Sequence, residues 1–224
     1  MTTRELTLAL REDDAGSPRF TAALAGERGP GIVVIHEWWG LNDELRAQCA
    51  RFAAEGFVAL APDLYDRPAT TDPAEALARA SALRTEDATE RVARCVRELR
   101  GRGAPKVGVT GFCLGGAMAF AAAASVEGLS AAVPFYGNAR ADYMVAERMR
   151  CPIQAHFAEG DPFARAEPAV GLARDVRAAG GRMDLFFYEA KHAFMRESDP
   201  DAYHEPSATL AWERAIAFLH AELG

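Results

Sequence analysis

Short apolar runs bounded by glycine and proline alternate along the chain with longer segments in which apolar residues recur at helical spacing. This alternation is typical of βα units that build a mostly parallel sheet with helices on both faces. The apolar runs predict strands at residues 32–35, 57–61, 107–110, 129–136, 153–157 and 183–187. The helical spacing predicts helices at residues 42–55, 73–83, 86–99, 117–124, 166–179 and 206–223.

The opening of the chain predicts an antiparallel hairpin at the edge of this sheet. Residues 5–10 and 20–24 read as strands, and the turn-rich segment 13–18 separates them. The chain shows no repeat at a fixed period, no low-complexity tract and no linker long enough to divide it. The sequence therefore predicts a single α/β domain over residues 1–224.

Composition and charge exclude several classes of protein function. The chain is 50% hydrophobic and 25% charged, with a net charge of −7, so it has no general electrostatic reason to bind nucleic acid or an anionic membrane. No apolar run approaches the roughly 18 residues that span a bilayer. Arg4, Glu5 and Arg11 interrupt the region where a secretory signal would be apolar, and the four cysteines form no CxxC pair. We expect a cytoplasmic protein with no nucleic-acid or membrane partner.

The segment KVGVTGFCLGGAM, residues 106–118, carries the main chemical signal. A β-branched strand runs into Gly-x-Cys-x-Gly and then into an alanine-rich helix, which is the context of a nucleophile elbow with Cys113 as nucleophile. Gly111 and Gly115 would leave room at the sharp turn. The helix N-terminus is expected to lower the thiol pKa, and the Leu114 N–H to form half of an oxyanion hole. A buried structural cysteine or a nucleotide-binding turn is the alternative.

An acid and a base follow Cys113 in the chain order of an α/β-hydrolase. Asp161 lies in a turn just after the strand at 153–157, and His192 lies in the loop after the strand at 183–187. His192 would accept the thiol proton and return one to the leaving group, while Asp161 would orient the imidazole. Taken singly, Asp161 suits an ordinary Gly-Asp-Pro turn and His192 a surface loop.

Six short motifs extend this pattern over nearly the whole chain: HEWWGL at 36–41, APDLY at 61–65, GFCLGG at 111–116, FYG at 135–137, EGDP at 159–162 and HAF at 192–194. With these motifs the sequence resembles the dienelactone hydrolase family of α/β-hydrolases. The resemblance implies an eight-stranded α/β-hydrolase core without a large cap. It maps the family's Cys-His-Asp triad onto Cys113, His192 and Asp161.

The resemblance also implies a role for the loop after the strand at 32–35. A glutamate in the family contacts the catalytic thiol and takes up its proton once substrate enters, and Glu37 stands at that place. The Trp38 N–H would complete the oxyanion hole with that of Leu114. Without the motif, Glu37 would read as a solvated loop carboxylate.

Substrate recognition in the family resembles a carboxylate clamp formed by two arginines. Arg196 matches one of them, and a planar guanidinium suits the task because it binds a carboxylate in bidentate fashion. The second would come from Arg79 or Arg84, although residues 74–84 hold no tyrosine and no clear family pattern. The aromatic residues expected either to line the pocket or to pack in the core are Tyr136, Trp38 and Trp39. Arg196 as a solvated surface charge is the alternative.

Three functions remain open at this stage. The leading one is a hydrolase that opens a small dienelactone-type lactone (a carboxymethylenebutenolide, from aromatic-compound degradation) through an acyl-thioester on Cys113. The alternatives are a general carboxylesterase or thioesterase on the same triad, and a thiol-redox or binding protein. The five histidines show no metal-ligand spacing, so we expect no metal and no cofactor. The expected partner is a small ester or lactone, with or without a carboxylate, and the expected state is a monomer or small homo-oligomer.

Overall fold

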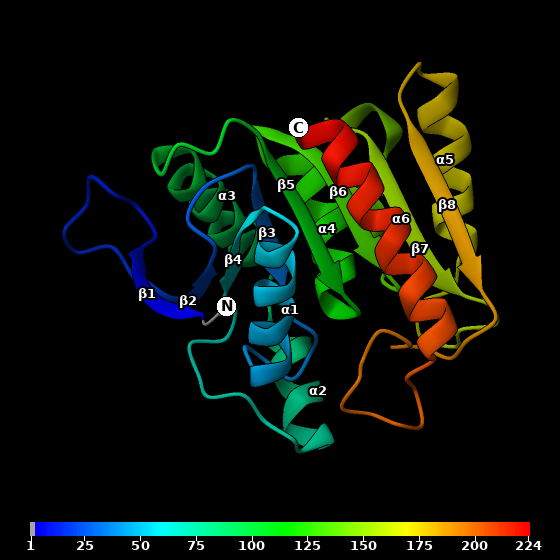
Figure 1. Ribbon diagram of the computed structural model, residues 1–224, viewed down its shortest axis with the longest axis horizontal. Helices are drawn as coiled ribbons and strands as arrows, with labels where there is room; N and C mark the ends of the chain where they lie inside the picture. Colours follow the sequence, from blue (N-terminus) through cyan, green and yellow to red (C-terminus); the bar gives the residue numbers. More distant parts are fainter. Residues whose placement is uncertain (1–2) are drawn as a thin grey trace.

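The computed structural model describes residues 3–224, through which an eight-stranded sheet runs in the order β1-β2-β4-β3-β5-β6-β7-β8 (Figure 1). Its strands are β1 (Arg4–Ala9), β2 (Arg19–Ala25), β3 (Gly31–Ile35), β4 (Val58–Pro62), β5 (Val107–Phe112), β6 (Leu129–Phe135), β7 (Ile153–Ala158) and β8 (Met183–Tyr188). The α-helices are α1 (Asp43–Ala54), α2 (Pro73–Ala82), α3 (Thr85–Gly101), α4 (Leu114–Ser125), α5 (Glu167–Ala178) and α6 (Glu205–Leu223).

The predicted α/β architecture is confirmed. Strands β3 to β8 pair in parallel, whereas β1 and β2 form an antiparallel hairpin that joins the sheet through β4. Helix α4 begins at Leu114 instead of residue 117, because packing overrides the low helix propensity of Gly115 and Gly116. Two short 3-10 helices at Ala141–Tyr143 and Ala146–Arg148 were not predicted.

Helices cover both faces of the sheet (Figure 1). Helices α1 and α6 pack on one face, where their apolar residues share a core cluster with Ile32 and Val34 of β3. Helices α3, α4 and α5 pack on the other, where the cluster includes Val33 and Ile35. Every residue of β3 is buried, as expected of a central parallel strand between two helical layers.

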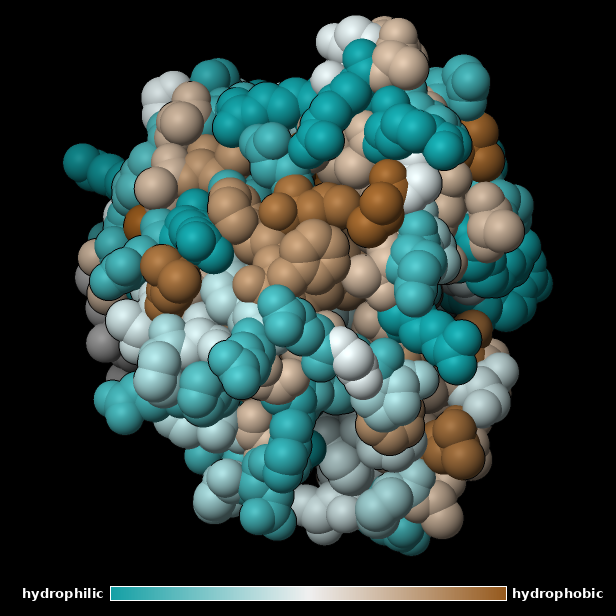
Figure 2. Space-filling model, turned by 90° about the vertical axis from the view of Figure 1, so that its right-hand side faces the viewer, coloured by the Kyte–Doolittle hydropathy of each residue, from teal (hydrophilic) through white to brown (hydrophobic). Residues whose placement is uncertain are grey.

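The edge strand β8 and helix α5 leave apolar residues uncovered. Phe187 of β8 is 42% exposed and Val170 of α5 is 49% exposed. Figure 2 views the side of the molecule where these two elements lie and shows an apolar area bordered by polar residues. Across residues 3–224, no helix is both long and apolar enough to cross a bilayer. The oligomeric state stays a prediction.

The sheet also determines where chemistry can occur. In parallel strands the carboxyl ends meet along one edge, and ligands bind beyond that edge in open α/β sheets. The segments that leave β3, β5, β7 and β8 carry Glu37, Cys113, Asp161 and His192 respectively. Four residues that are far apart in the sequence are thereby brought to one place.

The close approach of α4 to β6 gives a test of this packing. A Cβ added at Gly116 would lie 2.3 Å from the Phe135 carbonyl oxygen, whereas a Cβ added at Gly171 of α5 meets nothing within 4 Å. We expect Gly116→Ala to lower the free energy of unfolding by about 2 kcal/mol or more. Gly171→Ala should leave it unchanged or raise it by up to about 1 kcal/mol, because alanine is the better helix former. Urea denaturation of both variants measures this, and equal effects would contradict the packing argument.

Candidate active site

Cys113 occupies a strained turn between β5 and α4. Its backbone has φ 54° and ψ −113°, a conformation that residues other than glycine rarely adopt. A Cβ added at Gly111 would lie 2.3 Å from the Gly115 carbonyl oxygen. A Cβ added at Gly115 would lie 2.3 Å from the Ile35 carbonyl oxygen. The turn therefore has the geometry predicted for a nucleophile elbow, and it presents a half-buried thiol at the sheet edge.

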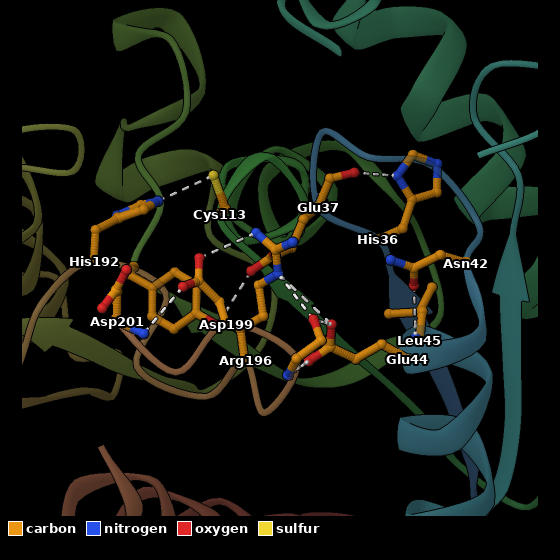
Figure 3. Close-up of polar contacts among 12 residues, drawn as sticks. His36, Glu37, Asn42, Glu44, Leu45, Cys113, His192, Arg196, Asp199 and Asp201 are labelled. Carbon is orange, nitrogen blue, oxygen red and sulfur yellow. Dashed lines mark hydrogen bonds and ion pairs between the residues drawn. The ribbon is translucent and has the colours of Figure 1, made fainter. Parts of the chain in front are cut away.

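The thiol, the imidazole and the carboxylate form a continuous chain of contacts. His192 Nε2 lies 3.1 Å from Cys113 Sγ, and His192 Nδ1 lies 2.6 Å from Asp161 Oδ2. Figure 3 shows the His192 ring directed at the Cys113 sulfur. With the proton on Nδ1 donated to Asp161, Nε2 is left free to accept the thiol proton.

Asp161 is held as an anion. The N–H groups of Phe163 and Ala164 donate to its other oxygen, Oδ1, at 2.8 and 3.0 Å. Burial of this carboxyl raises its pKa, but the hydrogen bond to His192 and the two backbone donors outweigh burial, so the net pKa of Asp161 is lowered. An anionic Asp161 can orient the imidazole and stabilise its cation.

The electrostatics of Cys113 differ from the sequence expectation. The helix N-terminus was expected to lower the thiol pKa, but burial and then the neighbouring Glu37 carboxylate raise the pKa of Cys113 to about 12. The Leu114 N–H acts in the opposite direction and is too weak to reverse them. The resting thiol is therefore neutral, and its reactivity depends on a nearby base.

Glu37 follows β3 and lies beside this thiol (Figure 3). Burial raises the pKa of Glu37 to about 7, and the nearby Arg196 opposes that rise. The Tyr136 hydroxyl donates to Glu37 Oε1 at 3.4 Å. Glu37, Tyr136 and Arg196 line a cavity of about 30 Å³, which is room for about one water molecule. Glu37 thus changes its charge near neutral pH.

His36 holds the peptide that links Glu37 to Trp38. Its Nε2 accepts the Leu64 N–H at 3.0 Å, which leaves the proton on Nδ1, and Nδ1 donates to the Glu37 carbonyl at 2.5 Å. The N–H and C=O of a trans peptide point in opposite directions. The Trp38 N–H is therefore directed away from His36, while the Leu114 N–H points at the Cys113 sulfur. Their oxyanion-hole role stays a prediction. Sequence reasoning placed His36 in the HEWWGL motif and tested it as a metal ligand, but missed this role.

Arg196 is surrounded by carboxylates (Figure 3). Its Nε lies 4.0 Å from Glu37 Oε2 and 3.7 Å from Glu44 Oε2, and its Nη1 lies 3.6 Å from Asp199 Oδ2. Its guanidinium carbon lies 4.7 Å from the centre of the Trp39 ring. Sequence reasoning missed both Glu44 and Asp199. The spacing from Arg196 to Asp199 was a usable signal, but nothing local connects Glu44 to Arg196.

The other two arginines predicted to bind substrate lie elsewhere. Arg79 donates to the Pro68 carbonyl at 2.6 Å and to Glu75 at 2.5 Å. The Arg84 side chain is 70% exposed and lies 3.8 Å from Glu86. Arg79 and Arg84 line a cavity of about 420 Å³, whereas Arg196 lines the smaller cavity beside Glu37. The structure thus does not join either of them with Arg196 in one cavity.

Aromatic rings surround the imidazole. Tyr136 is only 1% exposed, and its ring centre lies 5.2 Å from that of His192. The ring centre of Phe163, which the sequence analysis did not single out, also lies 5.2 Å from that of His192, and Phe163 is 81% exposed. Trp38 and Trp39 are half-buried and contact each other with ring centres 4.9 Å apart. In the described part of the chain, no cluster of three or more histidine, cysteine or acidic residues could hold a metal ion.

Comparison with known proteins agrees with this architecture. The family model described as "Dienelactone hydrolase family" matches residues 20–223. Protein usf of Aquifex pyrophilus is 36% identical over 206 residues, which cover 85% of this chain and 87% of that protein. A carboxymethylenebutenolidase of Pseudomonas sp. (strain P51) is 34% identical, with 91% of each chain covered. The crystal structure of a dienelactone hydrolase-like promiscuous phosphotriesterase from metagenomic libraries superposes with a TM-score of 0.82 at 22% identity over the whole of both chains.

The fold and the turn at Cys113 define an α/β-hydrolase. The family match then makes the assignment narrower: the chain belongs to the dienelactone hydrolase family. The resemblance found in the sequence motifs is confirmed, and the protein is a hydrolase that acts on ester bonds.

The raised pKa of Glu37 predicts a pH-dependent stability. Because its pKa is about 7 in the folded chain and 4.5 is its ordinary value, the folded chain binds this proton more tightly than the unfolded chain. The resulting stabilisation is complete below about pH 4.5 and is lost as the pH rises through 7. The stability of Glu37→Gln relative to the wild type should therefore rise by about 3 kcal/mol between pH 4.5 and pH 8.

Urea denaturation at both pH values measures this difference. The matched control is Glu5→Gln, which removes a carboxylate that is 61% exposed. An equal pH dependence in the wild type and Glu37→Gln would show that the pKa of Glu37 is the same in the folded and the unfolded chain.

Proposed function

We propose that the protein hydrolyses a small lactone or ester through an acyl-thioester on Cys113. The observation that carries the proposal is the contact chain from Cys113 Sγ to His192 Nε2 at 3.1 Å and from His192 Nδ1 to Asp161 at 2.6 Å. A nucleophile within reach of a base, which is itself oriented by a third group, is the arrangement that nucleophilic catalysis requires. We propose further that residues 1–224 act as one cytoplasmic domain.

In the first half-reaction the Cys113 S–H proton passes to His192 Nε2 as the sulfur bonds to the substrate carbonyl carbon. The carbonyl oxygen becomes an oxyanion, which accepts hydrogen bonds from the Leu114 and Trp38 N–H groups. When the C–O bond breaks, His192 returns its proton to the leaving oxygen. In a lactone this oxygen remains on the acyl chain, whereas in an open ester it leaves as an alcohol.

In the second half-reaction water attacks the thioester carbon. His192 accepts a proton from this water, the C–S bond breaks, and the proton returns to the Cys113 sulfur, so the free enzyme is regenerated. Glu37 serves as a second proton acceptor for the thiol. Its pKa of about 7 is well suited to that task, because the group is available in both charge states near neutral pH.

The dienelactone-type lactone is the first substrate candidate, because the chain is 34% identical to a protein named carboxymethylenebutenolidase. A general carboxylesterase or thioesterase on the same triad is the second. A specific observation favours this second candidate: Arg79 is occupied by Glu75 and Pro68, and Arg84 is largely exposed. The family's two-arginine clamp therefore lacks a free second arginine beside Arg196.

Two substitutions test the triad. Cys113→Ala should abolish turnover of any ester, and Asp161→Asn should lower kcat by about 10²- to 10⁴-fold because the imidazole loses its orientation and the support for its cation. Steady-state hydrolysis of a nitrophenyl ester measures both effects. The matched control for Asp161→Asn is Asp184→Asn. Asp184 lies on the edge strand β8, and its carboxylate is 3.0 Å from Arg182. Wild-type activity in Cys113→Ala would remove Cys113 as the nucleophile.

A second measurement separates the two substrate candidates. Loss of a dienelactone's ultraviolet absorbance with purified wild-type protein, and not with Cys113→Ala, would select the lactone. Cleavage of a neutral nitrophenyl ester without loss of the lactone would keep the triad and select the general esterase. Cleavage of neither would favour the thiol-redox or binding alternative.

A further inference from the structure

We propose that Glu44 is a specificity-determining residue. By compensating the charge of Arg196 it keeps this guanidinium from binding an anionic substrate, so that the thiol of Cys113 serves uncharged acyl groups. This inference rests on the proposed function in so far as the acyl group reaches Cys113 past Arg196. Of the two substrate candidates it selects the ester without a carboxylate, and it names the residue responsible.

The first support is the set of contacts around Glu44. Its Oε2 lies 3.7 Å from Arg196 Nε and accepts the Ser198 hydroxyl at 2.5 Å, while its Oε1 accepts the Ser198 N–H at 3.4 Å. Ser198 Oγ in turn accepts from Arg196 Nε at 3.3 Å. Glu44 projects from the first turn of α1, and Arg196 and Ser198 belong to the segment between β8 and α6. Hydrogen bonds on both oxygens thus fix Glu44 against the arginine.

The second support is the balance of charge. Glu37, Glu44 and Asp199 all lie within 4.0 Å of the one Arg196 guanidinium. Glu37 is partly protonated near pH 7, since its pKa is about 7, but the other two carboxylates alone exceed the single positive charge. A carboxylate that approached Arg196 would meet a net negative cluster, and like charges at this range repel.

The two arginines of α1 are occupied in the same way. Arg46 lies 3.3 Å from Glu5, and Arg51 lies 3.8 Å from Glu197 while its guanidinium stacks over Trp212 at 3.9 Å. Neither side chain is left to neutralise the cluster.

Two members of this cluster act on the reacting sulfur. Glu37 raises and Arg196 lowers the pKa of Cys113, so both charges are near enough to act on it. A reagent that must reach Cys113 therefore senses the charges around Arg196. This makes the preference measurable without any catalytic turnover.

The test compares two alkylating reagents of nearly the same shape, anionic iodoacetate and neutral iodoacetamide. The quantity measured is the ratio of their second-order rate constants at Cys113, followed by peptide mass spectrometry. Both reagents attack the same sulfur, so a change in its pKa or exposure cancels in the ratio. The variants are Glu44→Gln, which keeps the side-chain shape, and Asp199→Asn, which removes a second carboxylate from Arg196.

The matched control is Glu5→Gln, which also removes one carboxylate from an ion pair with an α1 arginine. We expect the iodoacetate-to-iodoacetamide ratio to rise about tenfold in Glu44→Gln and to stay at the wild-type value in Glu5→Gln. The rise should shrink as salt is increased from 0.05 to about 0.5 M, because ions screen exposed charges. A purely structural role for Glu44 would not produce that salt dependence.

The same ratio for an anionic and a neutral nitrophenyl ester completes the experiment. The anionic ester is nitrophenyl hemisuccinate and the neutral ester is nitrophenyl acetate. Glu44→Gln should raise the ratio of kcat/KM for the hemisuccinate to kcat/KM for the acetate by a similar factor. An unchanged alkylation ratio in both Glu44→Gln and Asp199→Asn overturns the inference. A shifted alkylation ratio in a protein that cleaves no ester supports the role of Glu44 and instead overturns the proposed function.

Discussion

The sharp turn at Cys113 is the constraint on which the rest of the site depends. To hold this residue at φ 54°, the chain must bring Gly111 and Gly115 so close that a Cβ on either would lie 2.3 Å from a backbone oxygen. The same contacts draw α4 against β3, and Gly116 lets it approach β6. Strain at one residue is thus supported by close packing on both sides, and the result is a thiol that projects beyond the sheet edge, where His192 can reach it.

Charge is the second organising feature, and it keeps the Cys113 thiol neutral in the resting site. The thiol pKa is raised by burial and by Glu37, while the Asp161 carboxylate remains anionic through its bonds to His192 and two backbone N–H groups. In the resting site the negative charge therefore lies on carboxylates and not on the Cys113 sulfur. A neutral thiol resists oxidation better than a thiolate, because the thiolate is the reactive form. In the proposed mechanism, proton acceptance by His192 or Glu37 is the step that prepares the nucleophile.

The surroundings of Arg196 show how neighbouring side chains determine what an arginine can bind. An arginine that meets Glu37, Glu44 and Asp199 is already compensated, so its presence in the sequence does not by itself indicate a free carboxylate site. Arg79 shows the same effect at its two terminal nitrogens, since Nη1 donates to the Pro68 carbonyl and Nη2 to Glu75. Whether a guanidinium serves a substrate depends on the partners that the fold places around it.

The sequence alone determined the α/β class, the strands and helices to within a few residues, and the family, because hydrophobic periodicity and short motifs are local properties of the chain. It also identified Cys113, Asp161 and His192 as candidates, since each follows a strand whose carboxyl end must reach the same sheet edge. Only the tertiary structure decided the charge state of the thiol and the occupancy of the arginines. Those properties depend on burial and on carboxylates such as Glu44, which lies far from Arg196 in the sequence and meets it only when α1 packs beside the loop after β8.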